Sequence, residues 1–349
     1  MIKSKIAGIG MYVPKNVVLN SDLTKYMDTS DEWIQERTGI KERRYADRTG
    51  ETTATMGIEA SKIAIERAGI TPQDIDFIIF ATLSPDYYFP GCGVLVQRVM
   101  KMKEIGALDV RNQCSGFVYG LSIGDQFIKS GMYKNILVIG SEKHSFGLDF
   151  NTRGRNITAI FGDGAGAVVL QPTEKDGQGI LSSHLHSDGE SAEILAMYNP
   201  GTHANHWMEE PVADFIHAEV GEMFMSKEMI DRAQNFPYMD GPAVFKKAVE
   251  KFPEVILEAL EKNNLTPTDL NMLVPHQANL RVSQFVQKKL GLRDDQVYNN
   301  IQRYGNTTAA SIPIALCEAW EEGKIKDNDL VCLAAFGSGF TWGSVLLRW

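Results

Sequence analysis

The chain has 349 residues, a formal net charge of −9 and a 44% share of hydrophobic residues. This length exceeds one typical core and predicts two domains or one duplicated domain, and the apolar share excludes a disordered or fibrous protein. The acidic balance argues against general nucleic-acid binding, but a local basic face would still suit an acidic partner.

The sequence predicts a cytoplasmic protein without a membrane span. The opening stretch MIKSKIAGIGMYVPKN has too short an apolar run for a signal peptide, and no later stretch reaches the ~18 apolar residues of a transmembrane helix. The cysteines form no close pair and no CxxC motif, which fits a reducing compartment and gives neither a disulfide framework nor a zinc ribbon. They are Cys92, Cys114, Cys317 and Cys332.

Two distant segments share one pattern, a TP turn followed by a buried strand. Residues 70–80 read ITPQDIDFIIF and residues 265–275 read LTPTDLNMLVP. An amphipathic helical stretch precedes each of them, over 53–68 and 243–263. The pattern therefore indicates an internal repeat.

The repeat continues further along the chain. Apolar strands are expected at 134–140 and 329–335, and each leads to an FGxG turn followed by another strand, at 161–170 and 336–347. Continuous apolar strands that alternate with helices are typical of sheets covered on both faces. Two such halves packed together would form a layered α-β-α-β-α sandwich.

We expect the halves to span 1–172 and 173–349, with an extra excursion at about 187–240 that has no counterpart in the first half. Two interpretations of the excursion remain open: a surface loop with a small core of its own, or a lid or wall of a flexible apolar pocket. It is rich in Met and aromatic residues, namely Met197, Tyr198, Trp207, Met208, Phe215, Met223, Phe224, Met225, Met229, Phe236, Tyr238 and Met239.

Cys114 lies where a strand is expected to give way to a helix. Residues 107–110 form a short apolar run that predicts a buried strand, and the helix that follows is expected to end at Gly131. At a helix N-terminus, free N–H groups and the helix dipole favour a thiolate, which suits a nucleophile. The alternative is a buried structural cysteine. The expected helix carries apolar or small residues at Phe117, Leu121, Gly124 and Ile128.

In the second half, His276 follows the repeated strand, and residues 304–313 (YGNTTAASIP) form a loop that opens a helix. Cys114 and Asn306 are candidate pseudo-symmetric mates at strand ends, where ligand crevices form. Alone, His276 would suit a core histidine and Asn306 a turn residue. Together with a cysteine they suit a papain-like hydrolase, whose signature around the cysteine is absent, or a thioester condensing enzyme.

Several motifs resemble β-ketoacyl-acyl-carrier-protein synthase III of the thiolase superfamily, and the resemblance covers nearly the whole chain except residues 187–240. It implies a thiolase-like five-layer fold built from two duplicated halves. The motifs are TSDEWIQERTGIKERR, QCSGFVYGL, FGDGAG, VPHQANLR, YGNTTAASIP and FGSGFTWGS.

The resemblance implies that Cys114 takes an acyl group from acyl-CoA as a thioester. His276 and Asn306 would then hold the carbonyl oxygen of malonyl-acyl carrier protein while it loses CO2, which would start fatty acid synthesis. Two preorganised donors suit the enolate, because its charge exists only in the transition state. The backbone N–H groups of Cys114 and Ser338 match the oxyanion hole of the family. Neither a metal nor a cofactor other than the acyl-CoA substrate is implied.

By the same resemblance, Trp33, Arg37 and Arg155 match positions that clamp the adenine and phosphates of coenzyme A. The alternative is that Trp33 packs on the surface of its helix and that Arg37 pairs with Glu36 or Glu32.

Arg281, Lys288 and Lys289 would form a basic strip on one helix. Such strips are usually solvated faces, but in this family the strip suits docking of the acidic carrier protein. Phe89 matches a residue that reaches into the acyl pocket of a partner subunit, which implies a homodimer.

Two rival functions remain open. One is a related enzyme that transfers acyl groups or condenses two long acyl chains. In head-to-head condensing relatives the partner loop supplies a glutamate base, whereas the corresponding stretch here ends in Phe89, with Asp86 as the only nearby acid. A non-catalytic carrier-binding module would be expected to have lost at least one of Cys114, His276 and Asn306. Two further patterns are discounted: the pair His203 and His206 is a weak metal site, and FGDGAG lacks the Lys of a phosphate loop.

Overall fold

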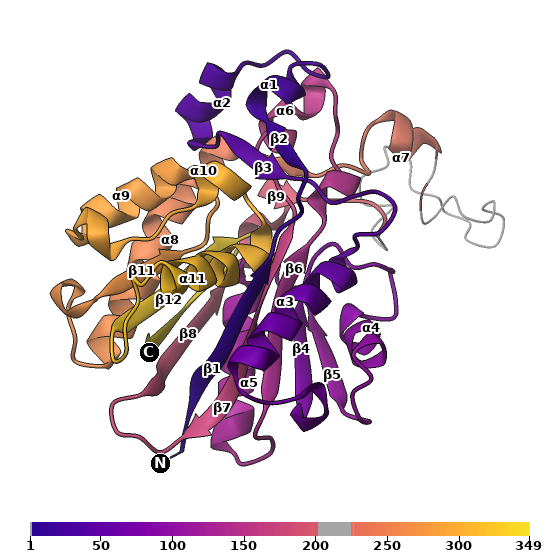
Figure 1. Cartoon of the computed structure of the whole chain (residues 1–349). Helices are drawn as coiled ribbons and strands as arrows, with labels where there is room; N and C mark the ends of the chain where they lie inside the picture. The colour runs from indigo at the N-terminus through magenta and orange to yellow at the C-terminus, as the bar shows by residue number, and fades with distance from the viewer. Residues whose placement is uncertain (1, 202–224, 226) are drawn as a thin grey trace.

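The computed structural model describes residues 2–201, 225 and 227–349. Two main sheets dominate the chain, and helices lie on both sides of each sheet (Figure 1). We call the sheet that contains the N-terminal strand the front sheet and the other the rear sheet. Every helix of the described ranges is too short or too polar to cross a membrane.

The front sheet has the strand order β1-β7-β6-β4-β5. Its β4, β5 and β6 run parallel to one another, and β7 is antiparallel to both β6 and β1. The strands are β1 (Lys3–Tyr12), β4 (Phe77–Ala81), β5 (Gly106–Val110), β6 (Ile136–Glu142) and β7 (Gly164–Thr173).

The rear sheet repeats this topology in the order β11-β12-β13-β8, with the first pair parallel and the other two pairs antiparallel. A single parallel bridge between Leu273 and Val297 takes the place of β5. The repeated sequence segments thus occupy equivalent places in the two sheets. The strands are β8 (Gly179–Ser187), β11 (Met272–Pro275), β12 (Leu330–Gly337) and β13 (Thr341–Arg348).

Three buried clusters separate the layers. The middle cluster joins Phe117 and Leu316, from the two helices between the sheets, to Val138 of the front sheet and Leu333 of the rear sheet. The outer two clusters lie between each sheet and its covering helices. The predicted five-layer sandwich is therefore confirmed. From front to rear, the helices are α3 (Thr53–Arg67) and α4 (Cys92–Val99), α5 (Gly116–Lys129) and α11 (Ser311–Glu321), and α8 (Gly241–Lys262) and α9 (Leu280–Leu290).

Short elements gather at one end of the two sheets, at the top of Figure 1. They bring the segment around Trp33 close to the start of α9, because the amide of Asn279 donates to the carbonyl of Arg37 at 2.9 Å. These elements are β2 (Val17–Leu19), α1 (Asn20–Leu23), α2 (Asp31–Thr38), β3 (Glu42–Arg44), α6 (Arg155–Thr158) and α10 (Ile301–Tyr304).

The two ends of the excursion lie together, because β9 (Leu195–Ala196) pairs antiparallel with β10 (Tyr238–Met239). Helix α7 (Lys227–Asp231) lies between them in sequence. Several candidates from the sequence fall outside the described residues, namely His203, His206, Trp207, Met208, Phe215, Met223 and Phe224.

The prediction of a buried strand before Cys114 is wrong in one respect. Strand β5 exists, but it is the edge strand of the front sheet, and none of its residues is fully buried. Leu108, for example, is 37% exposed. An apolar run alone does not distinguish a central strand from an apolar edge.

Candidate active site

One cavity of about 640 Å³ brings together the three residues singled out in the sequence, since Cys114, His276 and Asn306 all line it. Other parts of its wall come from α2, α6, the starts of α8 and α9, the β9 and β10 pair and the end of β12. The half of the chain that forms the front sheet (the front half) thus supplies a sulfur to this cavity. The half that forms the rear sheet (the rear half) supplies nitrogen groups to it.

Cys114 lies in the 3-10 turn η2 (Gln113–Ser115), directly before α5. The turn begins with a positive φ of 42° at Gln113, and Cys114 is 8% exposed. Gly337, at the end of β12, approaches it closely, because a Cβ at that position would lie 3.0 Å from Sγ. Only a glycine leaves room for the sulfur there.

The expectation of a thiolate at Cys114 is wrong. Burial raises the pKa of the Cys114 thiol to about 12, and the buried carboxylate of Glu142 adds to the rise. The backbone N–H groups of Cys114 and Ser338 point at the thiol and act in the opposite direction. Desolvation therefore outweighs the helix N-terminus, and the thiol is protonated at neutral pH.

His276 follows the last residue of β11, and its N–H continues the ladder by donating to the carbonyl of Ala334 at 2.8 Å. The ring nitrogen Nδ1 lies 2.6 Å from Oγ of Ser311, at the start of α11. Nε2 is buried and has no hydrogen-bond partner among the described residues. Burial lowers the pKa of His276 to about 3, so the ring is neutral.

The backbone of Asn306 is fixed by the FGDGAG turn. Asn306 N–H donates to the carbonyl of Ile160 at 2.9 Å, and Gly162 N–H donates to the carbonyl of Asn306 at 3.0 Å. A Cβ at position 162 would lie 2.2 Å from the carbonyl oxygen of Tyr304, so this close approach requires glycine. Gly162 thus allows a close backbone approach behind the cavity, whereas Gly164 and Gly166 belong to β7 and pack against α11.

The side chain of Asn306 is also oriented. Its Oδ1 accepts a hydrogen bond from Thr308 N–H at 2.8 Å. Since the amide oxygen is occupied, the amide nitrogen is the group that Asn306 offers to a molecule in the cavity.

Comparison with known proteins agrees with this geometry. Models of the 3-oxoacyl-[acyl-carrier-protein] synthase III family match residues 108–189 and, for its C-terminal part, residues 260–349. The β-ketoacyl-[acyl-carrier-protein] synthase III of Caldanaerobacter subterraneus subsp. tengcongensis is 43% identical and covers 100% of this chain and 98% of its own length. The crystal structure of the Aquifex aeolicus synthase, also 43% identical, has a TM-score of 0.85 and covers 99% of this chain and 100% of that chain.

The chain belongs to the β-ketoacyl-[acyl-carrier-protein] synthase III family. This makes it a condensing acyltransferase of fatty acid synthesis with the thiolase fold. The Thermus thermophilus synthase III, 36% identical, has a TM-score of 0.87 and covers 99% of both chains. OleA of Xanthomonas campestris, at 18% identity and a TM-score of 0.82, shares the fold alone.

Among the residues expected to bind coenzyme A in this synthase III family, Trp33 and Arg37 line the mouth of the cavity. The guanidinium carbons of Arg37 and Arg155 lie 4.5 and 5.2 Å from the centre of the Trp33 ring. Arg37 also pairs with Glu36 at 3.5 Å, and the backbone carbonyl of Asp28 accepts a hydrogen bond from Arg155. An indole with two cations beside it is therefore present at the entrance.

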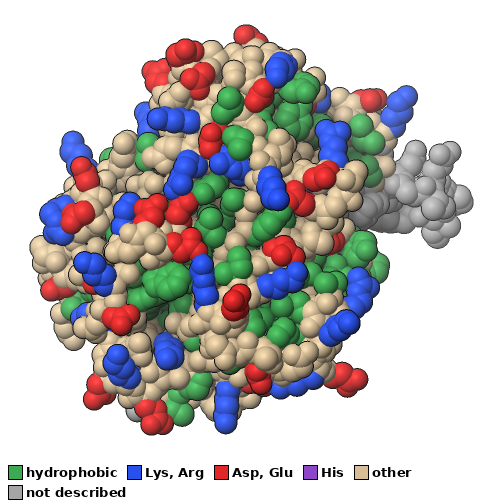
Figure 2. Space-filling model, in the orientation of Figure 1, with side chains coloured by type: hydrophobic (Ala, Val, Ile, Leu, Met, Phe, Trp, Pro, Cys, Tyr) green, Lys and Arg blue, Asp and Glu red, His purple; other side chains and the backbone are tan. Residues whose placement is uncertain are grey.

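The expected carrier-docking residues Arg281, Lys288 and Lys289 are exposed on α9. None of the three forms an ion pair with another residue of the described ranges. Arg281 also lines the cavity mouth and lies 5.9 Å from the ring centre of Phe245. On the face shown in Figure 2, basic and acidic side chains are interspersed.

Phe89 does not line the cavity of its own chain and is 80% exposed. Asp86, the nearby acid, is occupied as a cap of α3: its carboxylate accepts from the hydroxyl of Thr52 at 2.7 Å and from Ala54 N–H at 2.9 Å. Asp86 is therefore not a free base.

The sequence did not reveal the apolar wall of the cavity, which α8 supplies through Val244, Phe245, Ala248 and Phe252. Their helical spacing does identify a buried face, but spacing alone cannot tell a face that meets a sheet from one that meets a cavity. Ser311, beside His276, was also missed.

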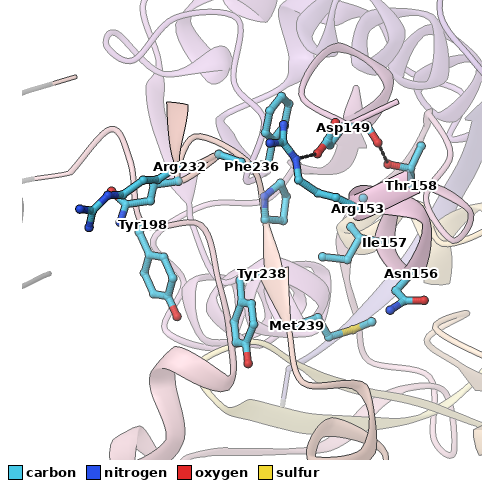
Figure 3. A pocket seen from close by; sticks show the side chains of 14 residues that line it. Asp149, Arg153, Asn156, Ile157, Thr158, Tyr198, Arg232, Phe236, Tyr238 and Met239 are labelled. Carbon is cyan, nitrogen blue, oxygen red and sulfur yellow. Dashed lines mark hydrogen bonds and ion pairs between the residues drawn. The ribbon is translucent and has the colours of Figure 1, made fainter. Parts of the chain in front are cut away.

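A second cavity, of about 330 Å³, adjoins the first and shares Asn156 and Met239 with it (Figure 3). Its charged groups are already paired. Arg153 binds Asp149 at 2.5 Å, and Arg232 binds Glu228 at 2.7 Å. In the described part of the chain, no group of three or more His, Cys, Asp or Glu side chains is placed to hold a metal ion.

Proposed function

We propose that this synthase III condenses acyl-CoA with malonyl-acyl carrier protein through an acyl intermediate on Cys114. The observation that supports it best is that Cys114, His276 and Asn306 line one cavity, with an unpartnered ring nitrogen and an oriented amide available in it.

In the first step, the sulfur of Cys114 attacks the thioester carbon of acyl-CoA, the bond to the coenzyme A sulfur breaks, and the thiol proton leaves with coenzyme A. The oxyanion formed on the way needs two donors. The N–H groups of Cys114 and Ser338 lie beside the sulfur, so the carbonyl oxygen of an acyl group bound to that sulfur would come within their reach.

In the second step, the malonyl group loses CO2, and the electron pair of the broken bond forms an enolate on the carrier thioester. Nε2 of His276 and the amide nitrogen of Asn306 would donate to its oxygen. The carbanion then attacks the Cys114 thioester, the sulfur is expelled, and it takes up one proton. This scheme needs no cofactor, because CO2 loss itself provides the nucleophile.

The expected binding roles remain part of the proposal. A purine ring would stack at Trp33 between the cations of Arg37 and Arg155, which suit its phosphates. The exposed cations Arg281, Lys288 and Lys289 would receive the acidic carrier protein.

We also propose a homodimer in which Phe89 completes the acyl pocket of the partner. Exposed aromatic side chains and the free edge of β5 support a contact between copies on this side of the front sheet. A cytoplasmic location and the lack of nucleic-acid binding remain predictions.

One observation disfavours the rival that condenses two acyl chains without decarboxylation. That route needs a base to remove a proton from one chain. Asp86, the acid of the Phe89 loop, is held at the start of α3 instead.

The test compares Cys114→Ala, His276→Ala and Asn306→Ala with the unmodified chain. Intact mass spectrometry after incubation with acyl-CoA measures acyl loading, and CO2 release from malonyl-acyl carrier protein measures decarboxylation. We expect Cys114→Ala to lose the adduct. The other two variants should load normally and release CO2 about 10²- to 10³-fold more slowly. Equal loss of both steps in His276→Ala would contradict the assigned roles.

A further inference from the structure

We infer that Ser311 is a positioning residue for decarboxylation: its hydroxyl holds His276 in the tautomer that carries the proton on Nε2. This inference rests on the proposed function, in which Nε2 donates to the enolate oxygen. A neutral imidazole has one N–H donor and one acceptor nitrogen, so the partner of Nδ1 decides what Nε2 can do.

The geometry around Ser311 leaves its hydroxyl proton free to point at the His276 ring. Oγ lies 2.6 Å from Nδ1 of His276, and Gln277 N–H approaches the same oxygen at 3.4 Å. An N–H group can only donate, so Oγ accepts from Gln277. A hydroxyl oxygen could accept a second bond from the ring, but it also carries one proton of its own, and we infer that this proton points at Nδ1. Ser311 is 2% exposed, so water does not compete for this proton. Nδ1 is then the acceptor, and the ring proton is on Nε2.

The opposite tautomer would be unfavourable for the proposed step. With the proton on Nδ1, Nε2 would present a lone pair to the cavity and would repel an enolate oxygen. A doubly protonated ring would also have a donor at Nε2, but this form is not populated at neutral pH, because burial keeps the pKa of His276 far below its usual value. The donor at Nε2 therefore depends on an acceptor state at Nδ1.

Ser311 also connects the two proposed enolate donors. It belongs to the same segment as Asn306 and Thr308, and Thr308 N–H holds the amide oxygen of Asn306. One short segment of the rear half thus orients the amide directly and the imidazole through a hydroxyl.

The first test uses Ser311→Ala, with Ser311→Thr to restore the hydroxyl. Ser283→Ala is a matched control, because Ser283 is also buried but its hydroxyl has no hydrogen-bond partner among the described residues. Acyl loading and CO2 release are measured on the full chain. We expect Ser311→Ala to load at the normal rate and to release CO2 about 10-fold or more slowly, and the other two variants to behave like the unmodified chain.

The second measurement does not depend on a variant of Ser311 folding. Histidine side-chain ¹⁵N NMR of the unmodified chain should show Nδ1 of His276 unprotonated and Nε2 protonated, with the signals assigned by their loss in His276→Gln. Protonated Nδ1, or equal CO2 release by Ser311→Ala and Ser283→Ala, would overturn the inference. A His276→Ala variant that decarboxylates normally would instead mean that the proposed function itself fails.

Discussion

The two turns that open the inter-sheet helices have the same backbone but different chemistry. In the front half, η2 (Gln113–Ser115) leads into α5, and in the rear half, η9 (Thr308–Ala310) leads into α11. Each begins with a positive φ at a non-glycine residue, 42° at Gln113 and 49° at Thr308. The duplicated fold thus presents one unusual turn twice.

The second residue of the turn is Cys114 in front and Ala309 in the rear. The structure therefore corrects the expected pairing of Cys114 with Asn306, because Asn306 precedes η9 and is held by the FGDGAG turn instead. A duplicated backbone does not duplicate chemistry. The nucleophile Cys114 lies within η2, while the donor Asn306 lies two residues before η9 begins.

Each turn also packs against a glycine of the opposite sheet. Gly337 of β12 faces Cys114, and a Cβ there would lie 2.6 Å from the Cβ of Cys114. Gly140 of β6 faces Ala309, and a Cβ there would lie 2.3 Å from the carbonyl oxygen of Ala309. The two halves therefore position each other's turns.

The largest expected effect comes from adding a methyl group at Gly337 or Gly140, where it would collide with the turn packed against that glycine. Gly337→Ala should abolish acyl loading, because its methyl group occupies the space next to Sγ. Gly140→Ala should keep loading but slow CO2 release, because it displaces the turn that follows Asn306. Intact mass and CO2 assays separate the two results. Gly147→Ala, which adds a methyl group in open space, is the control. Equal effects on both steps in both variants would disprove the division of labour between the turns.

A smaller effect concerns the support of the rear turn. The Nε2 atom of His144 lies 2.7 Å from Oγ1 of Thr308, and burial lowers the pKa of His144 to about 3. Between about pH 6.5 and this value, the unfolded chain binds a proton that the folded chain does not, so stability falls as the pH falls.

His144→Gln removes this contribution while it keeps a polar group near Thr308. Below pH 6.5, the free energy of unfolding should therefore fall less steeply in the variant, by about 1.4 kcal/mol per pH unit. Urea unfolding at pH 7.5 and pH 5.5 measures the difference. Parallel pH profiles of the two proteins would show that His144 titrates normally.

A thiol placed in the rear turn is not expected to restore acyl loading to a chain that lacks Cys114. Ala309 is 1% exposed and does not line the main cavity. The double variant Cys114→Ala/Ala309→Cys should therefore form no acyl adduct by intact mass spectrometry, as with Cys114→Ala alone. An adduct on position 309 would mean that the cavity reaches both turns.

Local patterns predicted most of the helices and strands, and Cys114, His276 and Asn306 line one cavity as expected. Gly131 has the positive φ, 76°, expected after a helix, and the FGxG motifs do mark turns that lead into strands. These features depend on neighbouring residues, so the sequence carries them. The division of the chain at residue 172 stays a prediction.

Other features depend on residues that are distant in sequence. The hydrogen bond between His144 and Thr308 joins positions 164 residues apart, and no pattern of neighbouring residues in the sequence predicts it. The protonation of Cys114 was wrongly predicted for a related reason. A helix start is visible in the sequence, but the depth of burial that opposes it arises only when the two halves meet.

The protonated state of Cys114 has a consequence for how this protein meets reagents. Small alkylating agents and peroxide react with thiolates, and a buried thiol with a pKa of about 12 supplies very few of them near neutral pH. Because Cys114 is 8% exposed and lines the cavity, we expect a covalent inhibitor to need a shape that fits this cavity in addition to an electrophile.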